Sequence, residues 1–474
     1  MRHPSFACAI IAFCLGLWGL TGPSMWCDEI VTADLATRSM DEIMAVLAKV
    51  DAVHGLYYLI AKGLAELTGQ AGEVVLRLPS MLAITAASAV LAGIGRRIAG
   101  PGVGLVAGVL FAALPMVSLY AHEARSYALV ALLATVATWL LIRGIQDGGR
   151  RWFAGYAVAL ALMGLTNLIA LLLVMAHGAT LLWARPPRRA VLWWLAATTA
   201  GVLATLPLVL TAYQQKGAVA WIPVPTGAVL WDTVRDIAGS VLGTVVLVAL
   251  IGMGAWSGRR RHLGIAAVVL PWALLPPLAL VALSPVQSLF MPRYLFFCVP
   301  AWALAAAAGA VALRPAPRLA VLAALTALLV PANVAARAPG AKPMNVRAVA
   351  GVLNTHAQAG DLIVYVPRWP RLMWAAYPGP GSRLRDVTLE STARQTGTLV
   401  GADALKKDIS ARLASGGRRV WLVRLGQHSG GVEDLQRTRR RQIRAAGGYT
   451  MAGRWGFAGA RVILFERPVP GPVR

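Results

Sequence analysis

Runs of about twenty apolar residues alternate with short arginine-rich stretches along the first 340 residues. A helix of this length crosses the hydrocarbon core of a bilayer, so the pattern predicts an all-α polytopic membrane domain with about eleven spans. The run 152–166 is short, and together with the run after Asn167 it is alternatively one re-entrant element. The expected spans are residues 5–22, 78–95, 102–120, 127–143, 152–166, 168–184, 190–212, 237–256, 263–283, 292–312 and 318–336.

The charged residues of the loops predict the orientation. Basic residues gather in every second loop, at Arg96-Arg97, Arg143 with Arg150-Arg151, Arg185 with Arg188-Arg189, Arg259-Arg260-Arg261, and Arg314 with Arg318. The positive-inside rule places these loops and the N-terminus in the cytoplasm. Of the 20 acidic residues, only Asp147 falls in one of these loops, so the acids favour the same orientation. Residues 1–22 alternatively form a signal peptide, although the following Thr21–Cys27 segment is a poor cleavage site.

Composition agrees with a membrane protein. The 474 residues are 58% hydrophobic and 14% charged, whereas soluble proteins carry roughly 25% charged residues. The net charge of +25 does not indicate nucleic-acid binding, because most of the arginines before residue 340 lie in short loops between spans. The four cysteines lack the spacing of metal ligands and predict neither a zinc site nor a disulfide framework.

After about residue 338 the long apolar runs end, and glycine, proline and charged residues increase. The patterns predict strands at 361–366, 419–423, near Tyr449 and at 460–466, with helices at 402–415 and 431–446. This order predicts a small α/β domain. The sequence thus divides into a transmembrane domain, 1–338, and an extracytoplasmic α/β domain, 339–474. The basic cluster Arg437–Arg444 fits a solvated helix face better than a site for an anionic lipid or polymer.

The first outer loop, about 23–77, contains the most distinctive polar residues. It opens with Asp28 and Glu29 directly after the first span, where two adjacent carboxylates are costly unless they are solvated or functional. Two amphipathic helices, 39–49 and 56–68, are too short to span and are expected along the membrane surface. Where the first helix gives way to the second, Asp51, His54, Tyr57 and Tyr58 bring an acid, an imidazole and two phenols within eight positions.

Two further charged motifs lie on the same predicted face. The third and fourth spans are joined by Tyr120–Tyr127, which contains Glu123, Arg125 and Tyr127. Glu123 and Arg125 either form ion pairs, with each other or with lipid headgroups, or they belong to a functional site. Arg293 begins the tenth span and either snorkels to the interface or serves the same site.

These motifs in this order resemble the GT-C glycosyltransferases. The resemblance covers about residues 20–340 and rests on Asp28-Glu29, the Leu56-Tyr57-Tyr58 loop, Arg77-Leu78-Pro79-Ser80, Glu123-Ala124-Arg125 with Tyr127, and Pro292-Arg293-Tyr294-Leu295. The chain is most similar to the branch of protein O-mannosyltransferases and aminoarabinose transferases. The Asp51–Tyr58 run resembles actinobacterial polyprenyl-phosphate-mannose-dependent mannosyltransferases. Many relatives have His or Lys followed by two prolines before Leu-Tyr-Tyr, whereas this chain has Val53-His54-Gly55.

The resemblance implies an inverting hexosyltransferase that moves a sugar, mannose by similarity, from a polyprenyl-phosphate carrier to a glycan, lipid or protein acceptor. It implies Asp28 as the general base and Asp51 or Glu29 as a group that orients the acceptor. Arg125 and Arg293, with His54 as a further candidate, would stabilise the leaving phosphate. The same resemblance makes Tyr57, Tyr58, Glu123 and Tyr127 substrate-binding candidates, and the α/β domain a candidate for binding the acceptor.

The implied location is a bacterial cytoplasmic membrane, with the site on the outer face. Nothing in the sequence requires a metal, although Asp28, Glu29 and Asp51 are able to bind a divalent cation. A lipid-sugar flippase is one alternative, but it calls for charged residues near the midplane, where the spans hold only Asn167 and His177 as notable polar residues. A non-catalytic scaffold is the other, and it leaves the clustered acids, His and Tyr unexplained.

Overall fold

The computed structural model describes residues 4–258, 263–426 and 430–467, and its chain divides into two compact units. Among these residues, the helical unit comprises 4–20, 51–57 and 77–337. The α/β unit comprises 21–50, 58–76 and 338–467. Most of the first outer loop therefore folds with the C-terminal part of the chain.

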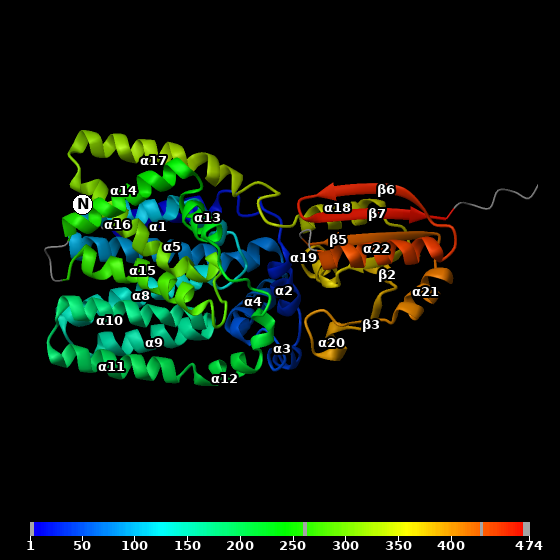
Figure 1. The fold of residues 1–474 in the computed structure, drawn as a ribbon, viewed down its shortest axis with the longest axis horizontal. Helices are drawn as coiled ribbons and strands as arrows, with labels where there is room; N and C mark the ends of the chain where they lie inside the picture. The colour runs from blue at the N-terminus through cyan, green and yellow to red at the C-terminus, as the bar shows by residue number, and fades with distance from the viewer. Residues whose placement is uncertain (1–3, 259–262, 427–429, 468–474) are drawn as a thin grey trace, which may run out of the picture. The chain divides into compact units, whose positions relative to one another are not determined.

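The helical unit consists of α-helices joined by short connections and 3-10 turns (Figure 1). Its elements are α1 (Pro4–Leu17), η1 (Ala52–His54), α5 (Glu73–Ala99), α6 (Pro101–Ala113), α7 (Pro115–Ala121), α8 (Tyr127–Asp147), α9 (Arg150–Thr166), η2 (Leu168–Leu172), α10 (Leu173–Ala184), α11 (Arg188–Leu203), α12 (Leu206–Gln214), η3 (Lys216–Val219), α13 (Gly227–Ala238), α14 (Val241–Gly258), α15 (Ile265–Leu283), η4 (Pro292–Cys298), α16 (Val299–Ala312) and α17 (Pro315–Ala335).

Among the described residues, six helices are long and apolar enough to cross a membrane, and up to eight spans result if two bent pairs each count as one. The bends lie between α6 and α7 (64°) and between α11 and α12 (44°). In both pairs the second helix has a proline in its first turn. The expected eleven exceed this count because α1 is short and the chain is interrupted at Asn167, whose side chain accepts a hydrogen bond from the backbone N–H of Ile169. The protein is a multi-pass membrane protein with a mostly helical body.

Small residues allow the central helices of this unit to approach closely. α14 packs along α16, and α16 packs along α6. A Cβ atom added at Gly254 would overlap the carbonyl oxygen of Ala305, and one added at Gly309 would overlap that of Leu250. Helices in membranes associate through such small-residue contacts because lipid offers no hydrophobic driving force between them.

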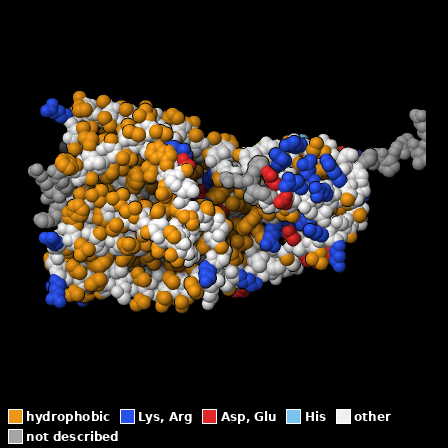
Figure 2. Space-filling model, viewed as in Figure 1, with side chains coloured by type: hydrophobic (Ala, Val, Ile, Leu, Met, Phe, Trp, Pro, Cys, Tyr) orange, Lys and Arg blue, Asp and Glu red, His pale blue; other side chains and the backbone are white. Residues whose placement is uncertain are grey.

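The surface of the helical unit is apolar over most of the face seen in Figure 2, and Lys and Arg side chains lie at one end. The last turn of α5 contains Arg96 and Arg97, and α9 begins with Arg150 and Arg151. The expected basic loop Arg259–Arg261 lies outside the described residues.

The α/β unit contains the remaining elements. They are α2 (Cys27–Ala36), α3 (Met40–Leu47), most of α4 (Gly55–Thr68), α18 (Val346–His356), β1 (Leu362–Val366), η5 (Trp369–Leu372), α19 (Met373–Ala376), η6 (Pro380–Arg383), β2 (Arg385–Asp386), β3 (Leu389–Ser391), α20 (Ala393–Thr396), β4 (Ala402–Asp403), α21 (Lys406–Ala414), β5 (Arg419–Leu425), α22 (Gly430–Ala445), β6 (Thr450–Phe457) and β7 (Ala460–Glu466).

Five strands form a mixed sheet in the order β2-β1-β5-β7-β6. β1 is parallel to β2 and β5, while β7 is antiparallel to β5 and β6. β1 is buried at every position, as expected of a parallel strand covered on both faces. The predicted strands and the helix at 431–446 are confirmed; the helix expected at 402–415 begins only at Lys406, because Ala402 and Asp403 pair with β3.

The loop helices α2 and α3 are joined to the C-terminal segment by buried and exposed polar contacts. The buried guanidinium of Arg38 pairs with Asp34 at 2.6 Å and donates hydrogen bonds to the carbonyl oxygens of Thr398 (2.8 Å) and Leu399 (2.9 Å). Lys49 Nζ donates to the Thr396 carbonyl oxygen at 2.7 Å. These contacts explain why the loop residues fold with the sheet.

Candidate active site

Asp28 lies in the first turn of α2, which begins directly after Trp26. A helix N-terminus interacts favourably with acidic side chains, so an acid is well placed at this position. Asp28 is half-buried, and among the described residues its carboxylate accepts one hydrogen bond, from Cys27 Sγ at 3.4 Å. The Asp28 carboxylate forms no ion pair with any Lys or Arg side chain that the structure describes. Asp28 is thus a partly accessible carboxylate that remains able to accept a proton.

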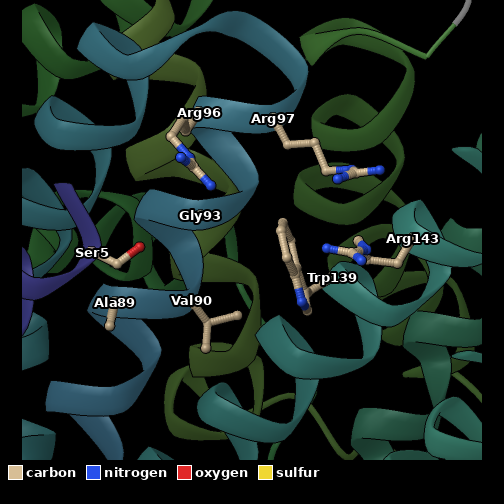
Figure 3. A pocket seen from close by; sticks show the side chains of 8 residues that line it. All are labelled: Ser5, Ala89, Val90, Gly93, Arg96, Arg97, Trp139 and Arg143. Carbon is tan, nitrogen blue, oxygen red and sulfur yellow. The ribbon is translucent and has the colours of Figure 1, made fainter. Parts of the chain in front are cut away.

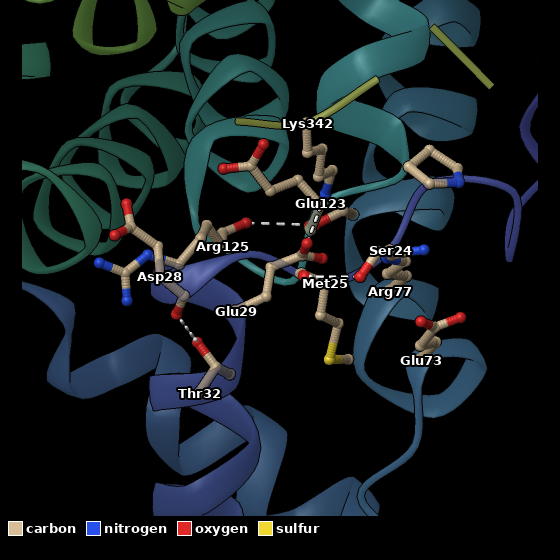
Figure 4. Close-up of polar contacts among 12 residues, drawn as sticks. Ser24, Met25, Asp28, Glu29, Thr32, Glu73, Arg77, Glu123, Arg125 and Lys342 are labelled. Atoms are coloured by element: carbon tan, nitrogen blue, oxygen red, sulfur yellow. Dashed lines mark hydrogen bonds and ion pairs between the residues drawn. The ribbon is translucent and has the colours of Figure 1, made fainter. Parts of the chain in front are cut away.

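Glu29, its neighbour, is in a different environment. Its side chain is fully buried, and its Oε2 lies 2.5 Å from Nζ of Lys342, which is equally buried (Figure 4). Lys342 stands just before α18, more than three hundred residues away in the chain. The adjacent acids are therefore separated into an accessible carboxylate and one held in a buried ion pair.

Residues of the C-terminal segment also hold the backbone that leads into α2. The Arg347 guanidinium donates to the carbonyl oxygens of Thr21 (2.6 Å), Pro23 (3.2 Å) and Gly22 (3.3 Å). Its backbone N–H donates to Ser24 Oγ at 2.9 Å. These bonds fix the chain only a few residues before Asp28.

A second contact to this backbone comes from Tyr377. Its hydroxyl accepts a hydrogen bond from the Met25 N–H at 2.8 Å and donates one to the carboxylate of Glu73, which also pairs with Arg347. Burial and the adjacent Glu73 carboxylate raise the pKa of the Tyr377 phenol, which therefore keeps its proton for this bond. Sequence reasoning missed Lys342, Arg347 and Tyr377, because each is an isolated polar residue in a segment without a motif.

In the helical unit, Asp51 and His54 are brought together by a short turn. Asp51 has a left-handed backbone (φ 64°) and its carbonyl oxygen accepts from the His54 N–H at 3.0 Å. Asp51 Oδ1 lies 3.9 Å from His54 Nε2. The turn therefore brings the Asp51 carboxylate and the His54 imidazole close to each other.

Ser80 connects three of the predicted motifs. It lies on α5, and its hydroxyl donates to the carbonyl oxygens of Glu123 (2.6 Å) and Arg125 (3.1 Å). The Tyr57 hydroxyl lies 3.3 Å from the same oxygen atom. The Arg77-Leu78-Pro79-Ser80 motif thus holds the loop between α7 and α8, and Arg77 Nη1 itself donates to the carbonyl oxygen of Leu20 at 2.8 Å.

The remaining predicted residues of the helical unit lie in or near an aromatic environment. Glu123, Arg125 and Tyr127 are all buried. The Tyr127 ring lies 5.4 Å from that of Tyr120 and 6.4 Å from that of Tyr294. Arg293 precedes Tyr294 and stacks its guanidinium 6.0 Å above the Trp221 ring. Buried charges such as Glu123 and Arg125 interact strongly with an ionic ligand, because little water screens them.

The predicted residues therefore fall into two sets. Asp28, Glu29 and Tyr58 belong to the α/β unit, and Tyr58 is fully buried. The set in the helical unit consists of Asp51, His54, Tyr57, Glu123, Arg125, Tyr127 and Arg293. Within residues 4–258, 263–426 and 430–467, no group of three or more His, Cys, Asp or Glu side chains is arranged to hold a metal ion.

Residues 55–211 match the family model described as dolichyl-phosphate-mannose-protein mannosyltransferase, and the sequence matches no curated protein. ArnT from Cupriavidus metallidurans, both in the apo state and bound to undecaprenyl phosphate, has a similar structure, with a TM-score of 0.63, 13% identity and 97% of each chain covered. The oligosaccharyltransferase AglB from Archaeoglobus fulgidus, in complex with an inhibitory peptide and a dolichol-phosphate, gives a TM-score of 0.53 at 11% identity, over 96% of this chain and 74% of that chain.

The chain has a GT-C fold. The resemblance indicated by the ordered motifs is thereby confirmed, and for the fold it extends beyond residue 340 to nearly the whole chain. The family match includes Tyr57, Tyr58, Glu123, Arg125 and Tyr127 of the predicted residues. The other candidates lie outside the matched segment.

Proposed function

We propose that the protein is an inverting glycosyltransferase that moves a sugar from a polyprenyl-phosphate carrier to an acceptor on the extracytoplasmic face. The main support is the similarity of fold along 97% of the chain to ArnT, one structure of which contains undecaprenyl phosphate. Mannose is the first sugar to test, because the family model that matches residues 55–211 describes mannosyltransferases.

The reaction is a single displacement at the anomeric carbon of the donor. The acceptor oxygen forms a bond to that carbon, and the bond from the carbon to the phosphate oxygen breaks. Its electrons leave with the polyprenyl phosphate, and the acceptor's proton passes to the carboxylate of Asp28. The accessibility of this carboxylate and its lack of a cationic partner among the described residues support the role of general base.

The leaving phosphate gains charge as the bond breaks, so fixed cations lower the barrier. Arg125 and Arg293 are proposed to bind it, because a guanidinium offers a bidentate fork to phosphate oxygens. His54 is a further cationic group when protonated beside Asp51. Tyr57, Tyr58, Glu123 and Tyr127 complete the proposed substrate-binding residues.

Asp51 is proposed to orient the acceptor. Glu29 is less suited to this role, because it is already paired with Lys342. AglB was solved with an inhibitory peptide, and the acceptor of this chain is proposed to be a glycan, a lipid or a protein. The α/β unit is proposed to bind the acceptor. The proposed location is a bacterial cytoplasmic membrane, with the α/β unit outside and the N-terminus in the cytoplasm.

The decisive experiment measures sugar transfer from radiolabelled polyprenyl-phosphate-mannose in membranes that contain the wild type or Asp28→Asn. We expect Asp28→Asn to lose about 100-fold or more in rate, because the amide cannot accept the proton. Asp41→Asn is the matched control, since Asp41 is an exposed acid in the first turn of α3, in the same loop.

Equal transfer by the wild type and Asp28→Asn would remove Asp28 from the mechanism and keep the enzyme. No transfer from any of a panel of lipid-linked sugars, with folded protein, would contradict the proposed function. A flippase would instead move the labelled lipid across vesicles without transferring the sugar. The buried His177 does not favour it, because its two nitrogens bond the hydroxyls of Thr138 (3.0 Å) and Tyr156 (2.9 Å) within the bundle.

A further inference from the structure

A pocket of about 680 Å³ opens on the helical unit between α1, α5 and α8 (Figure 3). Arg96, Arg97 and Arg143 lie on its rim, and the Trp139 ring forms one wall. Ala89 and Val90, about two turns before Arg96 on α5, line its other end. The pocket therefore has a cationic end, here called its mouth, and an apolar end.

The charges at the mouth are only partly compensated. Arg97 and Arg143 both pair with Asp147, and Arg97 Nε also donates to Gln146 Oε1 at 2.5 Å. Arg96 is exposed and has no ion pair with any described residue. Three guanidinium groups thus face a single carboxylate, which leaves a net positive charge for an anionic ligand.

Trp139 holds the two paired arginines in a fixed arrangement. The guanidinium carbons of Arg97 and Arg143 lie 5.8 Å and 5.5 Å from the centre of its ring. Arg143 also stacks 4.2 Å above the Trp152 ring. Arginines restrained in this way lose little side-chain freedom on binding, so the mouth is preorganised.

Gly93 provides the space beneath this mouth. A Cβ atom at Gly93 would lie 3.8 Å from Ser5 Oγ and 3.8 Å from the Trp139 ring, so a larger side chain at this position would extend into the space between them. Positions 89, 90 and 93 occupy one face of α5, because residues three and four apart are neighbours on a helix. This wall of small and apolar residues suits an acyl chain or glycerol backbone.

The pocket is separate from the residues proposed for sugar transfer. Along α5, Arg96 lies 16 residues beyond Ser80, which holds the loop of Glu123 and Arg125, and this corresponds to roughly 24 Å. The arginines at the pocket also belong to the loops that the positive-inside rule assigns to the cytoplasm. The pocket therefore faces the opposite leaflet from the proposed transfer reaction.

We propose that this pocket binds the phosphodiester headgroup of an anionic membrane phospholipid. Arg96 and the outer edges of Arg97 and Arg143 bind the phosphate oxygens, and the Ala89–Gly93 wall contacts the adjoining acyl chain. Arginine is suited to this task because its planar fork matches phosphate geometry. Basic pockets between transmembrane helices on the cytoplasmic side are a known type of lipid-headgroup site.

The positive-inside rule alone would explain why basic residues lie at the mouth of the pocket, but it would not explain how they are arranged. Positive-inside residues need only to be near the membrane, and they require no cavity and no stacking on Trp139. The proposal therefore predicts that binding depends on the pocket itself as well as on the charge.

The test is native mass spectrometry of the detergent-purified full-length chain, titrated with phosphatidylglycerol or with phosphatidylcholine of the same acyl chains. We expect tighter binding of phosphatidylglycerol, and about fivefold weaker binding by Arg96→Ala. Arg188→Ala is the control, because Arg188 is exposed at the start of α11 and does not line the pocket. Gly93→Leu fills the pocket without changing the charge and should weaken phosphatidylglycerol binding at least tenfold.

Equal weakening by Arg96→Ala and Arg188→Ala would overturn the proposal, because it would indicate a diffuse surface charge. Equal binding of the two lipids would overturn it as well. If inorganic phosphate at millimolar concentration displaced the lipid completely, the site would be an anion site and not a lipid site. Melting temperatures close to the wild type for all three variants show that the comparison concerns folded protein.

Discussion

Lys342 Nζ lies 2.5 Å from Glu29 Oε2, and both side chains are almost completely buried. Such a pair gains little over a well-packed apolar pair, but the loss of one partner removes a compensating charge from a medium of low polarity. The contact thus ties the start of α2, and with it Asp28, to the segment before α18.

Replacement of Lys342 by methionine should destabilise the protein by about 3–5 kcal/mol, because the buried Glu29 carboxylate loses its ion pair with Lys342. The double variant Glu29→Gln, Lys342→Met should recover most of this loss. Thermal unfolding of the purified protein in detergent measures both. Equal melting temperatures for the wild type and Lys342→Met would show that the pair does not stabilise the fold.

Asp51 has two separable properties, a left-handed backbone and a carboxylate. Asn and Gly both adopt this backbone readily, so Asp51→Asn and Asp51→Gly should fold like the wild type. Asp51→Ala should cost about 1 kcal/mol through backbone strain. If the carboxylate orients the acceptor, all three variants should transfer sugar about tenfold more slowly, as general effects of positioning predict. Full activity of Asp51→Asn would limit Asp51 to a conformational role.

Ser80 and Ser88 offer a matched pair on α5. Ser80 bonds the carbonyl oxygens of Glu123 and Arg125, whereas the buried Ser88 hydroxyl has no hydrogen-bond partner among the described residues. Ser80→Ala should cost about 1–3 kcal/mol and raise the KM for the lipid donor, because the Arg125 loop loses its anchor. Ser88→Ala should be neutral or slightly stabilising. Melting curves and donor titrations of the two variants test this, and similar behaviour of both would refute the anchoring role of Ser80.

The protonated Tyr377 phenol should make the folding stability of the protein decrease at alkaline pH. Burial and Glu73 raise its folded-state pKa above the ordinary tyrosine value of roughly 10. The contribution of Tyr377 to folding stability is therefore complete below pH 10. It is lost as the pH rises through the pKa of Tyr377 in the folded protein, because the tyrosine of the unfolded chain releases its proton first. The melting temperature should fall more steeply between pH 9.5 and 11 for the wild type than for Tyr377→Phe. Tyr213→Phe, at an exposed tyrosine, should follow the wild type.

Much of the architecture could be predicted from local pattern. Apolar runs long enough to span, and the buried strands β1 and β5, are visible in the sequence because burial on all sides requires continuous apolar residues. The break at Asn167 and the helix starting at Ser39, whose side chain forms a capping box with Glu42, also follow from nearby residues.

The site could be predicted only in part. Charged and aromatic residues in short loops between spans attract notice because a membrane makes them costly, and this signal made Asp28, Asp51, Glu123 and Arg125 candidates. Lys342, Arg347 and Tyr377 carry no such signal. A single basic or phenolic side chain in a polar segment is ordinary, and its partner lies hundreds of residues away.

By itself, then, the sequence determined a polytopic membrane protein with GT-C-like motifs and a C-terminal α/β fold, because hydrophobic periodicity and chain-local charge act over a few turns. Tertiary structure alone decided that the loop helices α2 and α3 fold with the C-terminal sheet, and that Glu29 is paired while Asp28 remains accessible. Two adjacent carboxylates are equivalent in a sequence. They become different only when folding buries one of them beside a distant cation.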